Sequence, residues 1–279
     1  MTPSRFKYLR PEDVRKLASF EFAPRALVEG YLAGRHKSLV RGASTMFRDY
    51  RPYVPGDDPR QVDWRVFART DRHYVRTFDQ ETNTGCNVVL DSSASMGFGR
   101  TQSKLDYASF FAAALAYLVI RRGDRASLTT FDDGLRRHIP AGSTGQHLNH
   151  LMHTLETNRP GAHTNLATTL LKIAPLLPRR GVLVILSDFL DDPLAIAGAL
   201  NLYIHRGFSI YMFQVLTPEE IDLEPRGLTA YLDLETGRRV VAHAANIQEA
   251  YRSAMHAHID TLRRIAIRRR IDFTLARTD

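Results

Sequence analysis

Two carboxylates and three hydroxyls stand where apolar segments of the sequence end or begin, and side chains of these types could bind a metal ion. They are Asp91, Ser93, Ser95, Thr164 and Asp188. An all-oxygen set of this kind suits a hard cation such as Mg²⁺, with Mn²⁺ or Ca²⁺ as substitutes, because Mg²⁺ takes six oxygen ligands and keeps some of its water. If only one of the two carboxylates coordinates directly and the other ligands are hydroxyls and water, the ion keeps net positive charge and an exchangeable position. The set therefore predicts a site that binds an acidic side chain of a partner without breaking a bond.

The segments that follow Cys86 predict the elements that position these residues. Short apolar runs alternate with amphipathic stretches, which is typical of an α/β fold with a mostly parallel sheet flanked by helices. The run 181–189 is continuously apolar, which indicates a central strand covered on both faces. In such sheets ligands gather at the C-terminal edge of the strands, especially where the strand order reverses. The first predicted strand ends in Asp91 and the central one ends in Ser187-Asp188, so we expect both acids at that edge.

The order of the predicted elements from Cys86 onward contains no internal repeat. The expected strands are 87–90, 125–132, 181–189, 208–215 and 271–276, with 135–140 as a possible hairpin partner of the second and a hairpin over 229–244. The expected helices are 104–123, 145–158, 165–177, 193–207 and 246–270.

The first 85 residues do not follow this alternation. After a helical start, two alternating segments, 46–53 and 74–81, flank a turn-rich stretch that contains Pro55-Gly56 and Asp58-Pro59. We therefore predict two parts, a helix plus a small β-rich subdomain over 1–85 and the α/β domain over 86–279. Trp64 is expected to anchor the packing of the small subdomain, since a large aromatic side chain buries much apolar surface.

Composition is that of a soluble globular chain. Of the 279 residues, 44% are hydrophobic and 24% are charged. The longest nearly apolar run, 108–120, is too short for a membrane span, and the N-terminus lacks the apolar core of a secretory signal. The chain has one cysteine, Cys86, which excludes an intramolecular disulfide and a thiolate zinc cluster. We expect a cytoplasmic protein without a membrane anchor.

The net charge of +8 is carried mainly by arginine, since only five of the 38 basic residues are lysine. Such a charge could favour nucleic acid, anionic lipid or an acidic protein. The basic residues are scattered and are not interleaved with aromatic residues, which favours a solvated surface over a nucleic-acid-binding face. The run 263–270 is the exception, and it is expected on the outer face of the last helix.

Two motifs resemble known families. The pentapeptide 91–95, DSSAS, matches the D-x-S-x-S metal-ion-dependent adhesion site of von Willebrand factor A domains, with Thr164 and Asp188 at the two remaining positions. The segment 50–69, YRPYVPGDDPRQVDWRVFAR, with GRHKS at 34–38 before it, is similar to the signature of the bacterial family called domain of unknown function 58. The resemblance covers most of the chain, from about Gly34 to the last strand.

The resemblance implies a von Willebrand factor A-like fold and a site that binds Mg²⁺ and, through it, a partner carboxylate. It also implies a partner, because members of the family typically accompany MoxR-type AAA+ ATPases. The chain would then be an adaptor or co-factor of such an ATPase in the assembly or maturation of client complexes, and not an enzyme. Its partner would be the ATPase or its client. Many relatives are membrane-anchored.

Other interpretations of the same residues remain open. Asp91, Ser93 and Ser95 could only cap a helix, for which Ser and Asp are common. A Mg²⁺-dependent hydrolase is the alternative function, with His163 as its one candidate base, and an Arg-rich nucleic-acid binder is a weaker alternative. The sequence has no phosphate-binding loop, H-E-x-x-H or G-x-S-x-G motif.

Two further groups of polar residues have a simpler interpretation as well as a functional one. Asp57 and Asp58 could pair with neighbouring arginines in a turn, or could occupy the open position of the metal. Three histidines at helical spacing are expected to form a polar helix face and not a metal site. They are His147, His150 and His153.

Overall fold

The computed structural model describes residues 7–8, 47–54, 62–78, 85–161, 163, 165–223, 227–234 and 237–278. The chain divides into two compact units, one over Gly30–Asn83 and the other formed by the rest of the chain. The larger unit carries the candidate site and is taken first.

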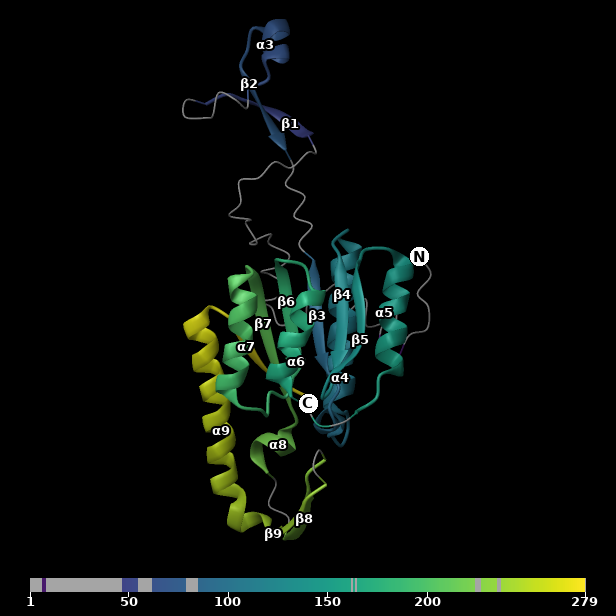
Figure 1. Ribbon diagram of the computed structural model, residues 1–279, viewed down its shortest axis with the longest axis vertical. Helices are drawn as coiled ribbons and strands as arrows, with labels where there is room; N and C mark the ends of the chain where they lie inside the picture. Colours follow the sequence, from purple (N-terminus) through teal and green to yellow (C-terminus); the bar gives the residue numbers. More distant parts are fainter. Residues whose placement is uncertain are drawn as a thin grey trace. The chain divides into compact units, whose positions relative to one another are not determined.

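A six-stranded sheet forms the centre of the larger unit (Figure 1). Its strands, in spatial order, are β10 (Asp272–Arg277), β7 (Phe208–Leu216), β6 (Gly181–Ser187), β3 (Cys86–Asp91), β4 (Ala126–Phe131) and β5 (Leu135–Gly142). All neighbours are parallel except β5, which pairs antiparallel with β4. The chain leaves β3 toward β4 on one side and returns to β6 on the other, so the strand order reverses beside β3.

Helices cover both faces of this sheet. They are α4 (Lys104–Arg121), α5 (Gly145–Thr157), α6 (Leu166–Ile173), α7 (Pro193–His205) and α9 (Ala244–Arg269). A further short helix, α8 (Pro218–Asp222), follows β7. Residues of α6, α7 and α9 share one hydrophobic core with the sheet, and that core includes Met212 of β7. The next residue, Phe213, packs its ring 4.7 Å from the ring of Phe111 of α4. Because side chains alternate along a strand, α4 lies on the opposite face.

Every residue of β3, β4 and β6 is buried, as expected of inner strands between two helical layers. The fold class predicted from the sequence is confirmed at the level of architecture: an α/β arrangement with a mostly parallel sheet flanked by helices. The long helix begins two residues earlier than predicted, at Ala244. The basic run falls on its exposed side, where Arg263, Arg264 and Arg268 face solvent.

A small polar network holds the N-terminal ends of three strands together. Asn87 Nδ2 donates to the carbonyl oxygens of Gly85 and Val182, both at 3.1 Å, and Ser127 Oγ donates to Asn87 Oδ1 at 2.8 Å. The chain enters β6 through Gly181, whose φ of 148° belongs to the region that favours glycine. A Cβ atom there would lie 2.7 Å from Gly85 O.

Beyond β7 the chain forms the short helix α8 and then the predicted hairpin. The hairpin strands are β8 (Leu228–Leu232) and β9 (Arg239–His243), which pair antiparallel as a separate two-stranded ribbon. Several large apolar side chains of the hairpin are exposed. They are Leu228, Leu232, Leu234, Val240 and Val241.

Residues 7 and 8 pack on the larger unit. Lys7 Nζ and Tyr8 Oη both donate to Asp106 Oδ1 of α4 at 2.6 Å, and the amide of Lys7 donates to Glu156 of α5. We predicted that all of residues 1–85 form the N-terminal part. In the structure, Lys7 and Tyr8 belong to the same compact unit as the α/β sheet.

The smaller unit contains an antiparallel pair, β1 (Phe47–Pro52) and β2 (Tyr74–Phe78), near the two predicted alternating segments. Between them lies a helix that was not predicted, α3 (Trp64–Thr70), which Asp63 caps by accepting from the amides of Arg65 and Val66. Trp64 is 58% exposed, so it is not the buried anchor that the sequence suggested. Asp57 and Asp58 lie outside the described residues.

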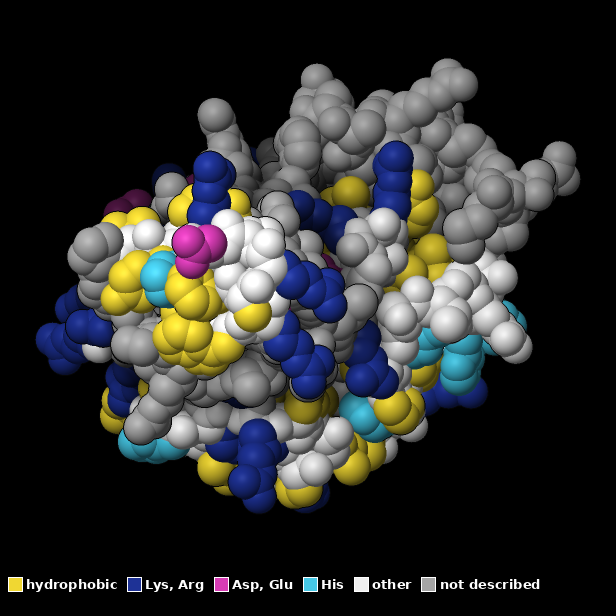
Figure 2. Space-filling model, turned by 90° about the horizontal axis from the view of Figure 1, so that it is seen from above, with side chains coloured by type: hydrophobic (Ala, Val, Ile, Leu, Met, Phe, Trp, Pro, Cys, Tyr) yellow, Lys and Arg dark blue, Asp and Glu magenta, His cyan; other side chains and the backbone are white. Residues whose placement is uncertain are grey.

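Basic side chains outnumber acidic ones on the face shown in Figure 2, and they are spread among hydrophobic and other polar side chains. Among the helices that the structure describes, none is long and apolar enough to cross a membrane.

Candidate cation site at the sheet edge

At the C-terminal edge of the sheet, the loop after β3 is hydrogen-bonded to the end of β4 and to the segment that follows α5. The Ser92 amide donates to Phe131 O at the end of β4, at 2.7 Å. The carbonyl of Ser92 accepts from the Gly161 amide at 2.7 Å, and the hydroxyl of Ser92 accepts from Asn158 Nδ2 at 2.7 Å. These contacts hold Ser92, the first residue of the loop, where the strand order reverses, which is where ligands of such sheets bind.

A chain of hydrogen bonds joins four of the five predicted ligands. Asp91 Oδ1 accepts from the Ser93 amide at 2.9 Å, and Ser93 Oγ lies 3.0 Å from Ser95 Oγ. Ser95 Oγ donates to Asp188 Oδ2 at 2.7 Å. The other oxygen of Asp91 accepts from Ser187 Oγ at 2.6 Å. The structure thus brings together side chains that are up to 97 positions apart in the sequence.

The fifth predicted ligand, Thr164, lies outside the described residues. Two described residues near it in the sequence have defined contacts. The Gly161 amide donates to Ser92 O, and Asn165 is the N-cap of α6, where its side chain accepts from the Thr168 amide at 3.0 Å. The role of Thr164 in the site stays a prediction.

The alternative interpretation, that residues 91–95 only cap a helix, disagrees with the hydrogen bonds that their side chains make. Ser93 precedes a short 3₁₀ helix (Ala94–Gly97) but makes no side-chain cap hydrogen bond. Ser103, eight residues later, is the N-cap of α4 and accepts from the Asp106 amide at 3.0 Å. The polar side chains of 91–95 instead contact each other and Asp188.

Burial and charge act together on Asp91. Asp91, Ser93 and Asp188 have no exposed surface. Burial, and after it the negative charge of Asp188, raise the pKa of the Asp91 carboxyl well above its ordinary value, although hydrogen bonds from Ser187 and Ser93 act in the opposite direction. The environment therefore favours either a proton or a cation beside these carboxylates.

A buried lysine supplies part of the balancing charge. Lys104 Nζ, with a side chain 0% exposed, donates to Asp188 Oδ2 at 2.8 Å and to Glu220 Oε1 at 2.6 Å. Burial alone would lower the pKa of Lys104, but the two carboxylates outweigh it and raise the pKa, so the side chain is an ammonium. Glu220 uses its other oxygen to accept from the Thr217 amide at 2.9 Å, which completes a capping box for α8.

The described side chains leave negative charge in this cluster without a cation. Asp188 and Glu220 share the single ammonium of Lys104, and Asp91 lies close enough to Asp188 to feel its charge. Two negative charges remain when all three acids are ionised, which matches a divalent cation. The oxygens of Ser93 and Ser95 add neutral hard donors to the same place. The residues present therefore fit Mg²⁺.

No three His, Cys, Asp or Glu side chains come together as a metal-binding group within the described ranges. The candidate site differs from such groups because hydroxyls make up half of its four described members. Cys86 lies buried at the start of β3, and burial raises the pKa of its thiol to about 12.

The sequence analysis missed Lys104 and Glu220, although each has a detectable signal. Lys104 is in the first turn of a helix, where a cation is unfavourable because the helix N-terminus carries partial positive charge. A lysine there, followed by a long apolar run, indicates a carboxylate partner. For Glu220 the signal is T-P-E-E at 217–220, which has the capping-box spacing.

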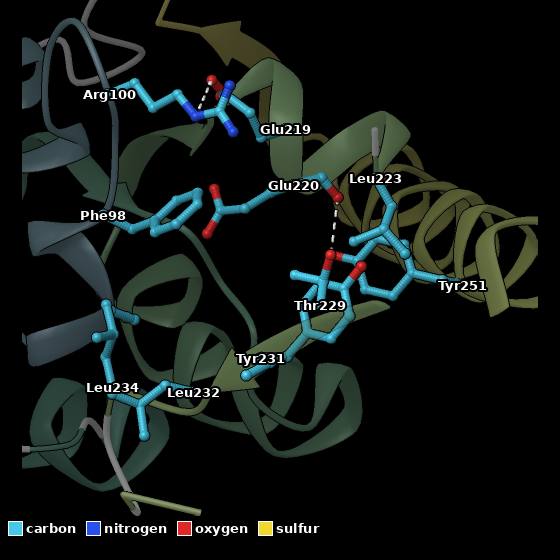
Figure 3. A pocket seen from close by; sticks show the side chains of 12 residues that line it. Phe98, Arg100, Glu219, Glu220, Leu223, Thr229, Tyr231, Leu232, Leu234 and Tyr251 are labelled. Atoms are coloured by element: carbon cyan, nitrogen blue, oxygen red, sulfur yellow. Dashed lines mark hydrogen bonds and ion pairs between the residues drawn. The ribbon is translucent and has the colours of Figure 1, made fainter. Parts of the chain in front are cut away.

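A pocket of about 510 Å³ borders the site (Figure 3). Its lining comes from the loop after β3, from α8, from the start of α9 and from the β8 strand with the turn after it. The side chains that line it include Ser95, Phe98, Arg100, Glu219, Glu220, Leu223, Tyr231, Leu232, Leu234 and Tyr251.

Comparison with known proteins identifies a family and relatives that match most of the chain. The family model described as "Protein of unknown function DUF58" matches residues 49–261. Uncharacterized protein Rv1480 of Mycobacterium tuberculosis and Uncharacterized protein Mb1516 of Mycobacterium bovis are each 30% identical over 236 residues, which is 81% of this chain and 72% of theirs.

Among solved structures, the conserved hypothetical protein BatB from Bacteroides thetaiotaomicron is 15% identical, with a TM-score of 0.43 over 70% of this chain and 90% of its own. An aerotolerance-related membrane protein from Bacteroides fragilis is 15% identical, with a TM-score of 0.41 over 70% and 92%. The SpRpn10 VWA domain is 13% identical, with a TM-score of 0.34 over 47% and 75%.

Proposed function

Because this chain belongs to the family of proteins of unknown function DUF58, we propose that it is a protein-interaction module that binds an acidic side chain of a partner through Mg²⁺. The residues that would hold the ion are Asp91, Ser93, Ser95, Thr164 and Asp188. In the same proposal the partner is a MoxR-type AAA+ ATPase or a protein that such an ATPase remodels, as the family resemblance implies.

The observation that carries the proposal is the hydrogen-bonded row of oxygens from Asp91 through Ser93 and Ser95 to Asp188, in a cluster where one buried ammonium is shared by Asp188 and Glu220. A divalent ion bound there supplies a positive charge that can attract a carboxylate from outside the chain.

The surrounding residues keep the oxygens in place before anything binds. Ser187 Oγ and the Ser93 amide hold the two oxygens of Asp91. Gln214 Nε2 donates to the backbone oxygen of Asp188 at 2.9 Å, and the Leu190 amide contacts Asp188 Oδ1 at 3.3 Å. A preformed set of donors lowers the cost of ordering the site on binding.

Calorimetric titration of the purified chain with MgCl₂ and MnCl₂ tests the proposal. We expect one site in the wild type and no binding by Asp91→Ala, because the mutation removes the directly coordinating carboxylate. Asp133→Ala is the matched control, since Asp133 is an exposed acid in the turn after β4. It should bind like the wild type.

Two results would contradict the proposal. One is equal binding by the wild type and Asp91→Ala. The other is a wild type that takes up neither ion when sodium acetate is present in excess to provide the carboxylate of a partner.

A further inference from the structure

We infer that the pocket beside Ser95 receives an extended segment of a partner protein that carries one acidic residue flanked by large apolar residues. The inference rests on the proposed function and specifies its partner. The acidic side chain would reach the cation site, while the neighbouring residues would lie along β8.

Access to the site points to the pocket. Of the four described candidate ligands, Asp91, Ser93 and Asp188 are fully buried, and Ser95 is partly exposed. Ser95 is also part of the pocket wall. A partner group that approaches over the described surface therefore meets the site through this pocket.

The remaining lining selects apolar side chains. Phe98, Leu223, Leu232 and Leu234 line the pocket together with the rings of Tyr231 and Tyr251 (Figure 3). Phe98, Leu232 and Leu234 are exposed in this structure, so a partner side chain placed against them removes apolar surface from water on both sides. Burial of one such side chain contributes about 1.5–3 kcal/mol.

The two acidic residues of the lining, Glu219 and Glu220, do not exclude an acidic partner side chain by repulsion, because each is paired with a cation. Glu220 is held by Lys104 at 2.6 Å, and Glu219 lies 3.8 Å from Arg100. The Arg100 side chain is 49% exposed at this wall, and a guanidinium has five N–H donors, so it can contact a second carboxylate as well as Glu219. Each acid of the lining thus has a cation beside it.

The shape of the pocket indicates an extended occupant. Four consecutive residues of β8, from 229 to 232, line it. Successive side chains of a strand point to opposite faces. A pocket lined by four consecutive residues of β8 therefore follows the length of the strand and is not confined to one face of the hairpin. None of the β9 residues lines it. Within the described chain, β8 pairs with β9 alone in a two-stranded ribbon, and such ribbons gain stability from a third strand.

The test uses a displayed library of short peptides with one fixed central aspartate and random residues on either side, selected on the full chain in MgCl₂. We expect large apolar residues to be enriched at alternating positions on one side of the aspartate. The double variant Leu232→Ser/Leu234→Ser should lose this enrichment and bind the best selected peptide at least tenfold more weakly.

The matched control is Leu228→Ser/Val240→Ser, which also removes two exposed apolar side chains of the hairpin, but neither residue lines the pocket. It should select and bind like the wild type. N-methylation of the selected peptide, one residue at a time, should weaken binding at every second position if its backbone pairs with β8.

The outcomes separate this inference from the proposed function. Apolar enrichment that Asp91→Ala leaves intact, and that Leu232→Ser/Leu234→Ser removes, supports the pocket and contradicts the cation-dependent function. Binding that Asp91→Ala abolishes, and that Leu232→Ser/Leu234→Ser leaves unchanged, overturns the pocket and supports the function. A wild type that enriches no apolar residue also overturns the inference.

Discussion

At the scale of single residues, Lys104 is the cation that contacts two carboxylates at the candidate site. Its ammonium lies between Asp188 and Glu220 with 0% of the side chain exposed. Removing one partner of a buried ion pair leaves a charge without compensation, which costs more than the pair itself contributes.

We therefore expect Lys104→Met to lower the free energy of unfolding by about 3 kcal/mol, because two carboxylates lose their shared cation. Urea unfolding followed by circular dichroism measures this. Lys104→Met/Glu220→Gln should recover part of the loss, since glutamine removes one charge and retains the capping box. Lys172→Met, at an exposed position of α6, serves as the control and should change stability by less than about 0.5 kcal/mol. A Lys104→Met variant as stable as this control would show that the ammonium is not needed to hold the carboxylates.

At the scale of elements, the entry into β6 depends on a residue without a side chain. Gly181 has a φ of 148°, and a Cβ atom would meet Gly85 O at 2.7 Å. Both effects act on the N-terminal end of the central strand, where Asn87 links β3 to β6.

Gly181→Ala is expected to destabilise the chain by about 2 kcal/mol, since backbone strain of this kind costs about 1–3 kcal/mol. Gly198→Ala provides a control of opposite sign. Gly198 is exposed inside α7 and nothing lies within 4 Å of its missing Cβ, so alanine should stabilise by about 0.5–1 kcal/mol. Thermal unfolding of both variants measures the difference. Equal melting temperatures for the two would contradict the argument.

The regular elements of the large unit could be predicted from the sequence because each one buries a recognisable apolar pattern. The run 181–187 is continuous because both faces of β6 are covered, and 208–216 follows the same rule. The short helices α3 and α8 escaped prediction, since seven and five residues are too few for a periodic pattern. Only their caps, Asp63 and Thr217, mark them.

The part of the candidate site that lies at strand ends could be predicted from the sequence, and the part that comes from helices could not. Asp91 is the last residue of β3 and Asp188 comes directly after β6, so their place at the sheet edge follows from topology alone. Lys104 and Glu220 reach the same edge from helices, and their meeting depends on how α4 and α8 pack, which a single sequence does not encode as a local pattern. The contribution of Thr164 stays a prediction.

At the scale of the whole molecule, the N-terminal residues 7 and 8 are bound to the α/β sheet unit through Asp106. Burial alone would raise the pKa of Asp106, but hydrogen bonds from Lys7, Tyr8 and Ser103 outweigh it and hold the pKa below its ordinary value of 3.8. A carboxylate whose pKa is lowered by folding stabilises the fold above that ordinary value, and this contribution is lost as the pH falls through the lower, folded value.

Asp106→Asn should therefore be less stable than the wild type near pH 6, and the difference should shrink between about pH 4 and pH 2. Lys7 and Asp106 are 55% and 37% exposed, so solvent screening keeps the difference below about 1 kcal/mol. Urea midpoints measured across this range test the sign. A difference that grows on acidification would mean that the pKa of Asp106 is not lowered in the folded chain.

The single cysteine of the sequence has a practical consequence for such experiments. Cys86 is 1% exposed in β3, and its pKa of about 12 keeps the thiol protonated at neutral pH. Maleimide reagents attack the accessible thiolate, so the folded native chain stays unlabelled. A cysteine introduced at Leu228, which is 67% exposed and outside the pocket lining, then becomes the only reactive position, and a fluorophore attached there reports on the hairpin without any change to the native core.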